Sequence, residues 1–542
     1  MPPTHEVTNQ PPPRTGDTYA EDVALTEAVQ REGAGWAAEG LHSLGERAGD
    51  PAWSERGRAA NEHRPELVTH DRYGHRIDEV RYHPAYHDLM AAAVGAGLHA
   101  APWAEDRAGA HVARAAKFLL WSRVDSGHLC PVSMTYAVIP SLRRTPELAT
   151  EWEPRATSAT YDPRLVPADR KAGAMFGMAM TEKQGGSDVR ANTTRAAPTG
   201  AGDEHRLTGH KWFCSAPMSD AFLVLAQAPG GLSCFLVPRF TPDGQRNAFL
   251  LQRLKDKLGD RSNASAEVEL DATWGRLVGE EGRGVRAIIE MVAHTRLDCA
   301  VGAAAGMRHG LAEAAWHAAH RRVFDRRLAE QPLMRNVLAD LAVESEAATA
   351  LALRLARAFD QAGSDPHEAG LRRLATPVAK YWLCKRAPAH AAEALECLGG
   401  NGYVEESGMP RLFRQSPLNG IWEGSGNVQC LDVLRALRRA PESLEALLAE
   451  VMASAGADAR LDEAAADLRK TLTDPSEDTA RRAVERLALV LQGALLVRHG
   501  DPAVADAFVA SRLAGDAGRA FGTLPAGVDT PRILARAHPV LA

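Results

Sequence analysis

The sequence predicts an α+β fold that is mostly helical, with one small β region near its middle. Residues with apolar side chains recur at helical spacing over both ends of the chain, interrupted by Pro and Gly. Between these ends, DAFLVLAQ and LSCFLVPRF flank a Pro-Gly-Gly turn like the arms of a hairpin, and AEVELDA alternates with period two. At 542 residues the chain is too long for one core, so three or four packed units are expected.

Four domains follow from these patterns. Residues 1–170 are expected to form an N-terminal helical domain, and residues 171–283 a β domain of sandwich or barrel type. Long amphipathic stretches over residues 284–440 suit the antiparallel helices of a four-helix bundle. Residues 441–542 form a further helical extension. Its helical pattern is broken at SAGADAR, TDPSED and HGDPA.

Composition narrows the class of protein. The chain has 63 Lys plus Arg and 69 Asp plus Glu, a net charge of -6, so it has no general attraction for nucleic acid or anionic membranes. The N-terminus lacks the apolar run of a secretion signal, and no stretch reaches membrane-spanning length, so we expect a cytoplasmic protein. Seven cysteines without a CxxC pair predict buried or reactive thiols rather than a disulfide framework.

Two motifs suggest sites that the sequence context excludes. GAGLHA at residues 95–100 matches a dinucleotide-binding pattern, but it follows a helical run, whereas that pattern requires a preceding strand. His317 and His320 in HAAH have no third ligand nearby, so we predict no metal site.

Three segments have the groups needed to hold a flat ligand rich in acceptors. MAMTEKQGGSDVRANTTRA (178–196) combines a Gly-Gly turn with hydroxyl side chains, which could converge on a flavin ring or satisfy their own turn. In GHKWFCSAP (209–217), Trp212 and Phe213 end a short strand and could stack on a cofactor or pack in the core. IWEGSGN (421–427) leads into a helix with Asn427 as the expected N-cap, where a phosphate could bind; an ordinary capped helix is the alternative.

Glu423 lies between apolar Ile421 and Trp422 and the Gly-Ser-Gly turn. Burial of a carboxylate costs free energy, and in an apolar pocket its pKa should rise toward the range useful for proton abstraction. A solvated turn residue, or a partner of a nearby arginine, is the alternative.

Taken together, these segments resemble the acyl-CoA dehydrogenase family of flavoproteins. MTEKQGGSD is similar to its TExxxGSD segment, KWFCS to its KxWI[TS] segment, LGGNGY (398–403) to its GGxGY turn, and IWEGSGN to its IYEGT segment. Within the family, the sequence most resembles the AidB adaptive-response branch, which is linked to DNA alkylation. This likeness runs from NQPPP through RLKDKLGDRSNAS to IWEGSGN. It implies a homotetramer that binds FAD.

The resemblance also implies roles for particular residues. Glu423 would be the catalytic base that takes the α-proton of an acyl-CoA thioester while the β-hydrogen leaves as hydride to the flavin. Some relatives place the base at the position of Thr295, which cannot serve. The residues expected to contact or line the FAD site are Met180, Thr181, Gly186, Ser187, Trp212, Phe213, Cys214, Gly399, Gly400, Ile421, Trp422, Ser425 and Asn427.

A contact between subunits is implied as well. In the family an Arg and a Gln reach the FAD phosphates of a neighbouring subunit, and RRVFDRRLAEQ supplies Arg321 and Gln331 for this role. Asp325 replaces the usual Gly of that segment, and the Gln falls one position short.

The function expected from the branch is an FAD-dependent acyl-CoA dehydrogenase-like protein of the DNA alkylation response, with weak dehydrogenase activity and binding to double-stranded DNA. One alternative is a metabolic dehydrogenase of short or branched acyl thioesters, and another is a flavin oxidase or monooxygenase of a small nitrogenous compound. Residues 441–542 carry a net charge of -4, which disfavours DNA, but their arginines could gather on one face. These are Arg481, Arg482, Arg486, Arg498, Arg512, Arg519, Arg532 and Arg536; a solvated surface or a tetramer contact is the alternative.

Overall fold

The computed structural model describes residues 4–472 and 475–542. The chain folds into two compact units, each built from segments that are separate in the sequence. Among the described residues, the helical unit comprises 4–51, 108–123, 299–472 and 475–542, and the β unit comprises 52–107 and 124–298. Helix α9 (Gly284–His320) begins in the β unit and ends in the helical unit. The division into four domains stays a prediction.

The β unit contains a seven-stranded sheet in the order β3-β6-β4-β5-β9-β7, with β8 paired to β9. Because β7 also pairs with β6, the strands β6, β4, β5, β9 and β7 form a closed ring, which leaves these strands no free edge. The bounds are β3 (Phe176–Ala179), β4 (Arg195–Pro198), β5 (Glu204–Ser215), β6 (Ala221–Ala228), β7 (Gly231–Pro238), β8 (Phe249–Leu254) and β9 (Ser265–Val278).

Two features of this sheet confirm expectations from the sequence. The predicted hairpin is β6 and β7, which pair antiparallel from Ala221 opposite Pro238 to Ala228 opposite Gly231. The alternating AEVELDA segment lies within β9. Side chains such as Phe222, Phe235 and Phe249 fill the interior of this unit.

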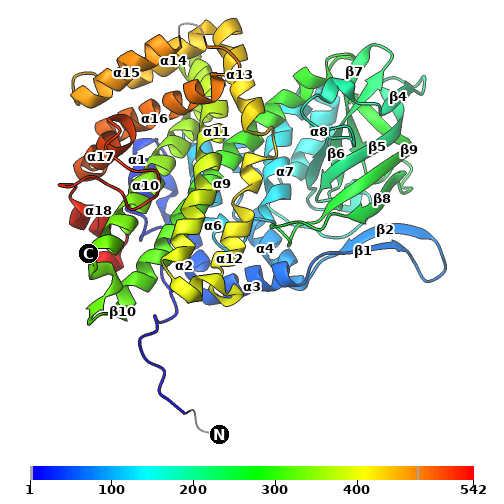
Figure 1. The fold of residues 1–542 in the computed structure, drawn as a ribbon. Helices are drawn as coiled ribbons and strands as arrows, with labels where there is room; N and C mark the ends of the chain where they lie inside the picture. Colours follow the sequence, from blue (N-terminus) through cyan, green and yellow to red (C-terminus); the bar gives the residue numbers. More distant parts are fainter. Residues whose placement is uncertain (1–3, 473–474) are drawn as a thin grey trace. The chain divides into compact units, whose positions relative to one another are not determined.

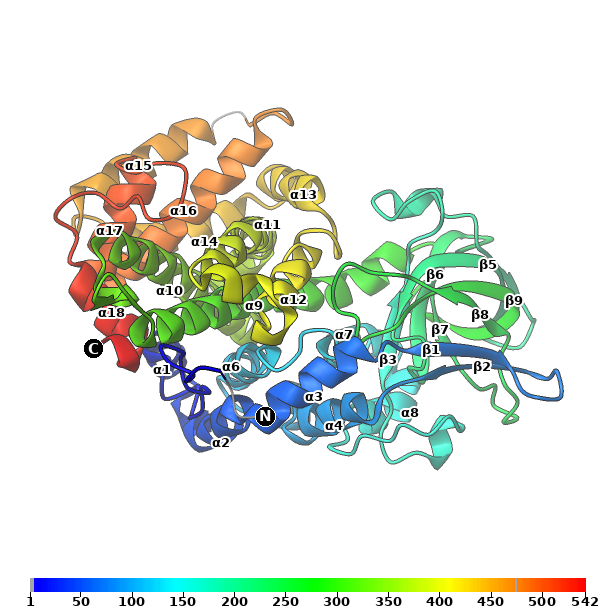
Figure 2. The ribbon, with the colours of Figure 1, turned by 60° about the horizontal axis from the view of Figure 1, so that its bottom comes forward.

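A second hairpin corrects the expectation that the first 170 residues are helical. Strands β1 (Glu66–His70) and β2 (Arg76–Arg81) pair antiparallel and form an arm, with β1 beside β8 (Figures 1 and 2). ELVTH and RIDEVR alternate around the turn DRYGH, and this period-two pattern could have predicted the arm. The helices of this unit are α3 (Pro51–Glu62), α4 (Pro84–Gly95), α5 (Ala101–Ala104), α7 (Leu129–Leu142) and α8 (Pro146–Ala156).

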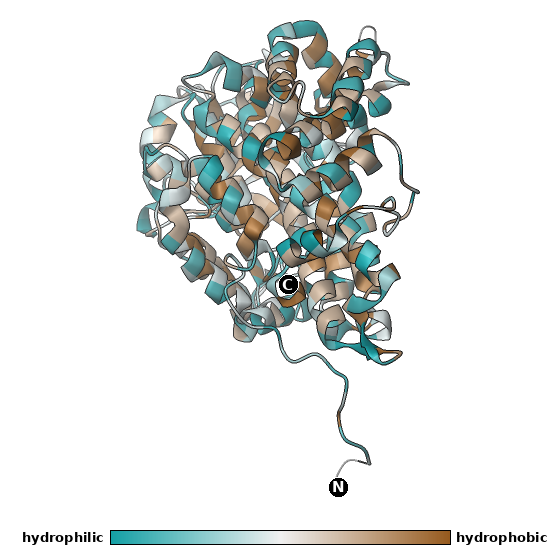
Figure 3. Ribbon diagram, turned by 90° about the vertical axis from the view of Figure 1, so that its left-hand side faces the viewer, coloured by the Kyte–Doolittle hydropathy of each residue, from teal (hydrophilic) through white to brown (hydrophobic). Residues whose placement is uncertain are grey.

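The helical unit is built on α9, α10 (Pro332–Gln361), α11 (Pro366–Glu396) and α13 (Gly426–Arg439), which run close together (Figure 1). Helix α11 packs against α10, α13, α14 and α16. Apolar and polar positions alternate around the helices, as amphipathic packing requires (Figure 3). The remaining helices are α1 (Val23–Arg31), α2 (Ala38–Gly49), α6 (Ala110–Ser122), α12 (Met409–Gln415), α14 (Pro441–Met452), α15 (Ala459–Thr471), α16 (Ala480–His499), α17 (Pro502–Phe508) and α18 (Thr530–Ala537).

Two observations bear on the expectations from composition. All seven cysteines are buried and none forms a disulfide. Over residues 4–472 and 475–542, no helix combines the length and apolar character needed to span a bilayer.

Candidate active site

The loop that carries Glu423 reverses direction sharply before α13. Glu423 has φ +58° and Gly424 has φ +92°, so two consecutive residues are left-handed. A Cβ atom on Gly424 would lie 2.8 Å from both Gln429 Nε2 and Val428 Cγ1, so only glycine fits this position. Glutamate rarely adopts a left-handed φ, which means that the surrounding structure must hold Glu423 in place.

Two buried side chains hold the backbone on both sides of Glu423. Lys380 on α11 donates from Nζ to the carbonyl oxygens of Trp422, at 2.7 Å, and Gly424, at 2.5 Å. Gln429 on α13 donates from Nε2 to the carbonyl oxygens of Glu423, at 3.0 Å, and Gly424, at 2.9 Å. Lys380 is 1% exposed and Gln429 is fully buried. Neither residue was predicted from the sequence, because no motif there marks them.

The predicted N-cap role of Asn427 is wrong. Helix α13 begins at Gly426, and the residue before it, Ser425, makes no capping hydrogen bond with its side chain. Asn427 lies in the first turn of α13 and its Oδ1 accepts a hydrogen bond of 2.8 Å from Arg481 Nε. The chain reverses direction at the left-handed residues 423 and 424, and α13 begins two residues later, at Gly426. The helix therefore starts one residue before Asn427. The first turn therefore has no side-chain cap over its N–H groups.

The neighbouring predicted residues differ in exposure. Ile421 is 63% exposed, whereas Trp422 is half-buried and its indole N–H donates to Asn419 Oδ1 at 2.9 Å. Gly399 and Gly400 are both exposed and begin a short 3-10 turn, in which Gly399 has φ +58°. The helical unit thus brings Trp422, Glu423 and Ser425 together at the start of α13.

In the β unit, a buried ion pair supports the Gly-Gly turn. The fully buried carboxylate of Glu182 accepts from Lys211 Nζ at 2.9 Å and from the backbone N–H groups of Thr193, at 2.6 Å, and Thr194, at 3.1 Å. Burial alone would raise the pKa of Glu182, but these hydrogen bonds and the charge of Lys211 hold it well below its ordinary value of 4.5. Burial lowers the pKa of Lys211.

The turn itself presents donors at the surface. Met180 and Thr181 are half-buried, and Gly186 and Ser187 are exposed. A Cβ atom on Gly186 would lie 2.4 Å from Thr181 Oγ1, so a larger residue here would have to displace the Thr181 side chain. The backbone N–H of Trp212 donates to the Thr181 carbonyl at 2.8 Å, which joins the two predicted β-unit motifs.

The aromatic segment at the end of β5 is only partly available to a cofactor. Trp212 is half-buried and Phe213 is 52% exposed, but Cys214 is fully buried in the core of the β unit. Burial raises the pKa of the Cys214 thiol to about 12. The prediction that the Cys214 side chain lines the cofactor site is therefore wrong, because it faces the sheet interior. Lys255 Nζ lies 3.3 Å from the centre of the Trp212 ring, as a cation–π contact.

The predicted intersubunit residues lie at a small hairpin. Strands β10 (Arg322–Val323) and β11 (Arg326–Arg327) are joined by Phe324 at φ +49° and Asp325 at φ +64°. Asp325 therefore adopts the conformation that the family's glycine favours. Within this chain, Arg321 Nη1 donates to the Asn9 carbonyl at 2.8 Å and Gln331 Nε2 to the Val323 carbonyl at 3.0 Å.

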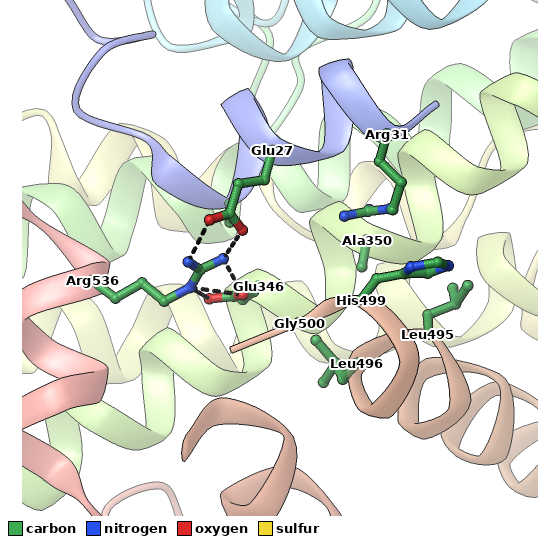
Figure 4. A pocket seen from close by; sticks show the side chains of 10 residues that line it. Glu27, Arg31, Glu346, Ala350, Leu495, Leu496, His499, Gly500 and Arg536 are labelled. Atoms are coloured by element: carbon green, nitrogen blue, oxygen red, sulfur yellow. Dashed lines mark hydrogen bonds and ion pairs between the residues drawn. The ribbon is translucent and has the colours of Figure 1, made fainter. Parts of the chain in front are cut away.

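Several arginines predicted to bind DNA are engaged in ion pairs within the chain. Arg498 pairs with Glu450 at 3.0 Å, Arg512 with Asp340 and Glu344, and Arg532 with Asp501 at 2.9 Å. Arg536 pairs with Glu27 and Glu346 (Figure 4). Carboxylates packed beside these four arginines neutralise their charge, which disfavours them as DNA contacts; binding of DNA by residues 441–542 stays a prediction. Among the described residues, Arg481, Arg482, Arg486 and Arg519 have no ion pair.

Thr295 lies where some relatives carry their base. It is 4% exposed, and its Oγ1 donates to the Val292 carbonyl at 3.1 Å within α9. This bond lies within the helix; that Thr295 is not the base stays a prediction.

Family models match three consecutive parts of the chain. Residues 9–163 match the adaptive response protein AidB N-terminal domain, residues 177–273 the acyl-CoA dehydrogenase middle domain, and residues 282–438 the acyl-CoA dehydrogenase C-terminal domain. The chain is 49% identical over 508 residues to the AidB protein of Escherichia coli (strain K12), covering 93% of this chain and 94% of that protein.

Two solved structures extend this likeness. Caenorhabditis elegans ACDH-11 in complex with C11-CoA matches with a TM-score of 0.85 and 29% identity, covering 94% of this chain and 93% of that one. A Bacillus anthracis acyl-CoA dehydrogenase complexed with FAD shares the fold, with a TM-score of 0.62 and 18% identity over 84% of this chain and 80% of that one. The family and fold expected from the four motifs are confirmed. The chain belongs to the acyl-CoA dehydrogenase family of FAD-dependent oxidoreductases acting on CH–CH groups, and within it to the AidB branch.

Proposed function

We propose that this protein dehydrogenates an acyl-CoA thioester at its α and β carbons, with Glu423 as the base that removes the α-proton. The observation that carries this proposal is the four hydrogen bonds by which Lys380 and Gln429 hold the loop around Glu423. Such a rigid loop keeps a carboxylate in one orientation, as proton abstraction from carbon requires.

The residues present fit FAD. In the β unit, the exposed turn at Gly186 and Ser187 offers backbone N–H groups. Trp212, whose backbone N–H bonds the Thr181 carbonyl, offers a flat ring for stacking. In the helical unit, the first turn of α13 has no side-chain cap and can receive a phosphate group. When bound, FAD would accept the hydride from the β carbon. Glu423 would hold the α-proton on its carboxylate.

An acyl-CoA substrate is supported by one relative in particular. The structure of Caenorhabditis elegans ACDH-11 was solved in complex with C11-CoA. An acyl-CoA thioester of similar chain length should therefore be tested as a substrate together with short and branched ones. The acyl chain length that this protein prefers is measured by comparing these thioesters.

We also propose that the protein is a homotetramer in which Arg321 and Gln331 approach a neighbouring subunit. Support comes from two large apolar side chains beside them. Phe324 at the hairpin tip is 92% exposed and Leu333 at the start of α10 is 84% exposed. Apolar side chains this exposed are typical of a surface that another chain covers.

Binding to double-stranded DNA in an alkylation response is a second proposed function, and only one helix supports it. On α16, Arg482 and Arg486 are four residues apart and so share a face, and Arg481 precedes them. If each of these three arginines contacts one phosphate, the DNA affinity should fall as the salt concentration rises. A plot of log affinity against log salt concentration should then have a slope of about -3. Gel-shift titrations of duplex DNA at several salt concentrations would measure it. Absence of binding at low salt would contradict this function.

The dehydrogenase proposal is tested by anaerobic addition of acyl-CoA thioesters to the purified flavoprotein. Straight-chain and branched thioesters of increasing length should be compared, with loss of flavin absorbance followed by stopped flow. Rapid, chain-length-dependent bleaching is expected. Protein that carries FAD but is bleached slowly by every thioester would contradict a main role in dehydrogenation.

A further inference from the structure

A cavity in the β unit is lined by none of the residues proposed for catalysis. It has a volume of about 190 Å³ and is lined by the arm strand β2, the loop after β7 and the start of β8. By the volume that water occupies in the liquid, this is room for about six water molecules. Its apolar lining comes from Ile77, Leu165, Phe240, Phe249 and Leu250.

One lining carboxylate has an unsatisfied oxygen. Asp78 on β2 is 6% exposed, and its Oδ2 accepts from Arg76 Nε at 2.9 Å. Its Oδ1 is buried and, among the residues the structure describes, has no hydrogen-bond partner. A buried acceptor left without a donor is unfavourable, so the site calls for a ligand or water that donates to Asp78.

Around the cavity, one arginine has no carboxylate in direct contact. Three guanidinium groups, of Arg76, Arg239 and Arg246, line it. Arg76 pairs with Asp78, and Arg246 lies 3.4 Å from Glu79. Within the described residues, Arg239 has no carboxylate at ion-pair distance, although it is only 5% exposed. Asp78 and Asp220 attract the charge of Arg239 without forming an ion pair with it, so an anion in direct contact with Arg239 would be favourable.

Arg239 also has N–H groups that are available for a ligand. Its Nη1 donates to the Pro217 carbonyl at 2.6 Å and its Nη2 to the Asp78 carbonyl at 3.1 Å. A guanidinium has five N–H donors, so three remain for a carboxylate. Burial lowers the pKa of Arg239 to about 10; the charges of Asp78 and Asp220 oppose this shift and Arg246 adds to it, so a bound anion would further stabilise the charged guanidinium.

We propose that this cavity binds a small hydroxy monocarboxylate with an aliphatic tail. Its carboxylate would accept from Arg239, its hydroxyl would donate to Asp78 Oδ1, and its tail would pack on Leu165 and Phe249. This role goes beyond dehydrogenation and uses none of the residues assigned to it.

The test is isothermal titration calorimetry of the full-length protein with 2-hydroxyisocaproate and isocaproate, which differ by one hydroxyl. The hydroxy acid should bind saturably and about tenfold or more tightly than isocaproate, the gain expected for a hydrogen bond to a charged acceptor. Asp78→Gly suits the φ of +43° at this position and should remove the preference between the two acids. Leu165→Trp should fill the cavity and abolish binding of both.

Asp243→Ala, which removes an exposed carboxylate from the loop after β7, is the matched control and should bind like the unmodified protein. Circular dichroism establishes that each variant folds; if Asp78→Gly fails, Leu165→Trp still tests occupancy of the cavity. The proposal is overturned if neither acid binds saturably, if Leu165→Trp leaves binding intact, or if the hydroxyl preference survives in Asp78→Gly. Equal binding of inorganic sulfate would overturn it too, since it would indicate an unspecific anion site.

Discussion

The ammonium group of Lys380 lies 2.7 Å from the carbonyl oxygen of Trp422, the residue directly before Glu423. The same group bonds the carbonyl of Gly424, directly after it. A helix side chain thus clamps the backbone on both sides of the proposed base, although 42 residues separate Lys380 from Trp422 in the sequence.

Lys380→Met should therefore act through Glu423. Loss of the clamp lets the left-handed loop relax and misplaces the carboxylate, so kcat should fall by about 100-fold while KM changes little. Steady-state kinetics with the best thioester measures both parameters. Lys470→Met, which removes an exposed lysine of the same unit, is the control. A rise in KM at constant kcat would show that Lys380 serves substrate binding instead.

Glu423→Gln should suppress flavin reduction by about 100-fold or more, because an amide cannot take the α-proton. The protein should still contain FAD, since the change leaves the loop backbone and its hydrogen bonds in place. Stopped-flow bleaching and the ratio of flavin to protein absorbance measure the two effects. Glu406→Gln, at an exposed carboxylate in the same unit, is the control. Unchanged bleaching in Glu423→Gln would remove Glu423 from catalysis.

Gly424→Ala should also impair the loop. A Cβ atom at 2.8 Å from Gln429 Nε2 displaces that side chain, and alanine resists a φ of +92°. We expect a loss of kcat similar to that of Lys380→Met. Gly363→Ala, where a Cβ atom meets nothing within 4 Å, is the matched control. Full activity in Gly424→Ala would show that the loop tolerates movement.

Lys211→Met should destabilise the β unit by about 3–5 kcal/mol, because it leaves the buried Glu182 carboxylate without its cation. Opening free energies of β5 from hydrogen exchange measure the loss. Lys183→Met, at an exposed lysine of the same turn, should change little.

The same pair predicts a pH dependence. The folded pKa of Glu182 lies below its ordinary value of 4.5, so the stability it contributes is present above that value and is lost as the pH falls through the folded pKa. In Glu182→Gln this loss on acidification should be smaller. An identical acid profile in both proteins would contradict the role of the pair.

Arg536→Met should loosen the C-terminal helix α18. Arg536 bonds Glu346 on α10 at 2.8 Å and Glu27 on α1 at 2.9 Å, and its removal leaves the Glu346 side chain, which is 11% exposed, without a cation (Figure 4). We expect a loss of about 3 kcal/mol and faster limited proteolysis near the C-terminus. Burial already raises the pKa of Glu346, and the variant should raise it further, so its stability should recover as the pH falls. Arg519→Met, at an exposed arginine, is the control.

Much of the fold could be predicted from local patterns. The turn between β6 and β7, the alternation in β9 and the long amphipathic helices each depend on residues close together in the sequence, and the structure has all three. The β1–β2 arm was missed although its alternation is visible, because short alternating segments beside helices are ambiguous. The proposed base, Glu423, was selected from the sequence by its motif alone.

The remaining features of the site were decided by tertiary structure. Which arginines are neutralised depends on carboxylates far away in the chain, such as Asp340 beside Arg512. The left-handed φ of Glu423 and the clamp from Lys380 likewise depend on how α11 packs against the loop. Most of the secondary structure and the family could be predicted, because periodicity, turns and motifs depend on residues close together in the chain. The partners of each charge and carbonyl could not, because they depend on packing between distant segments.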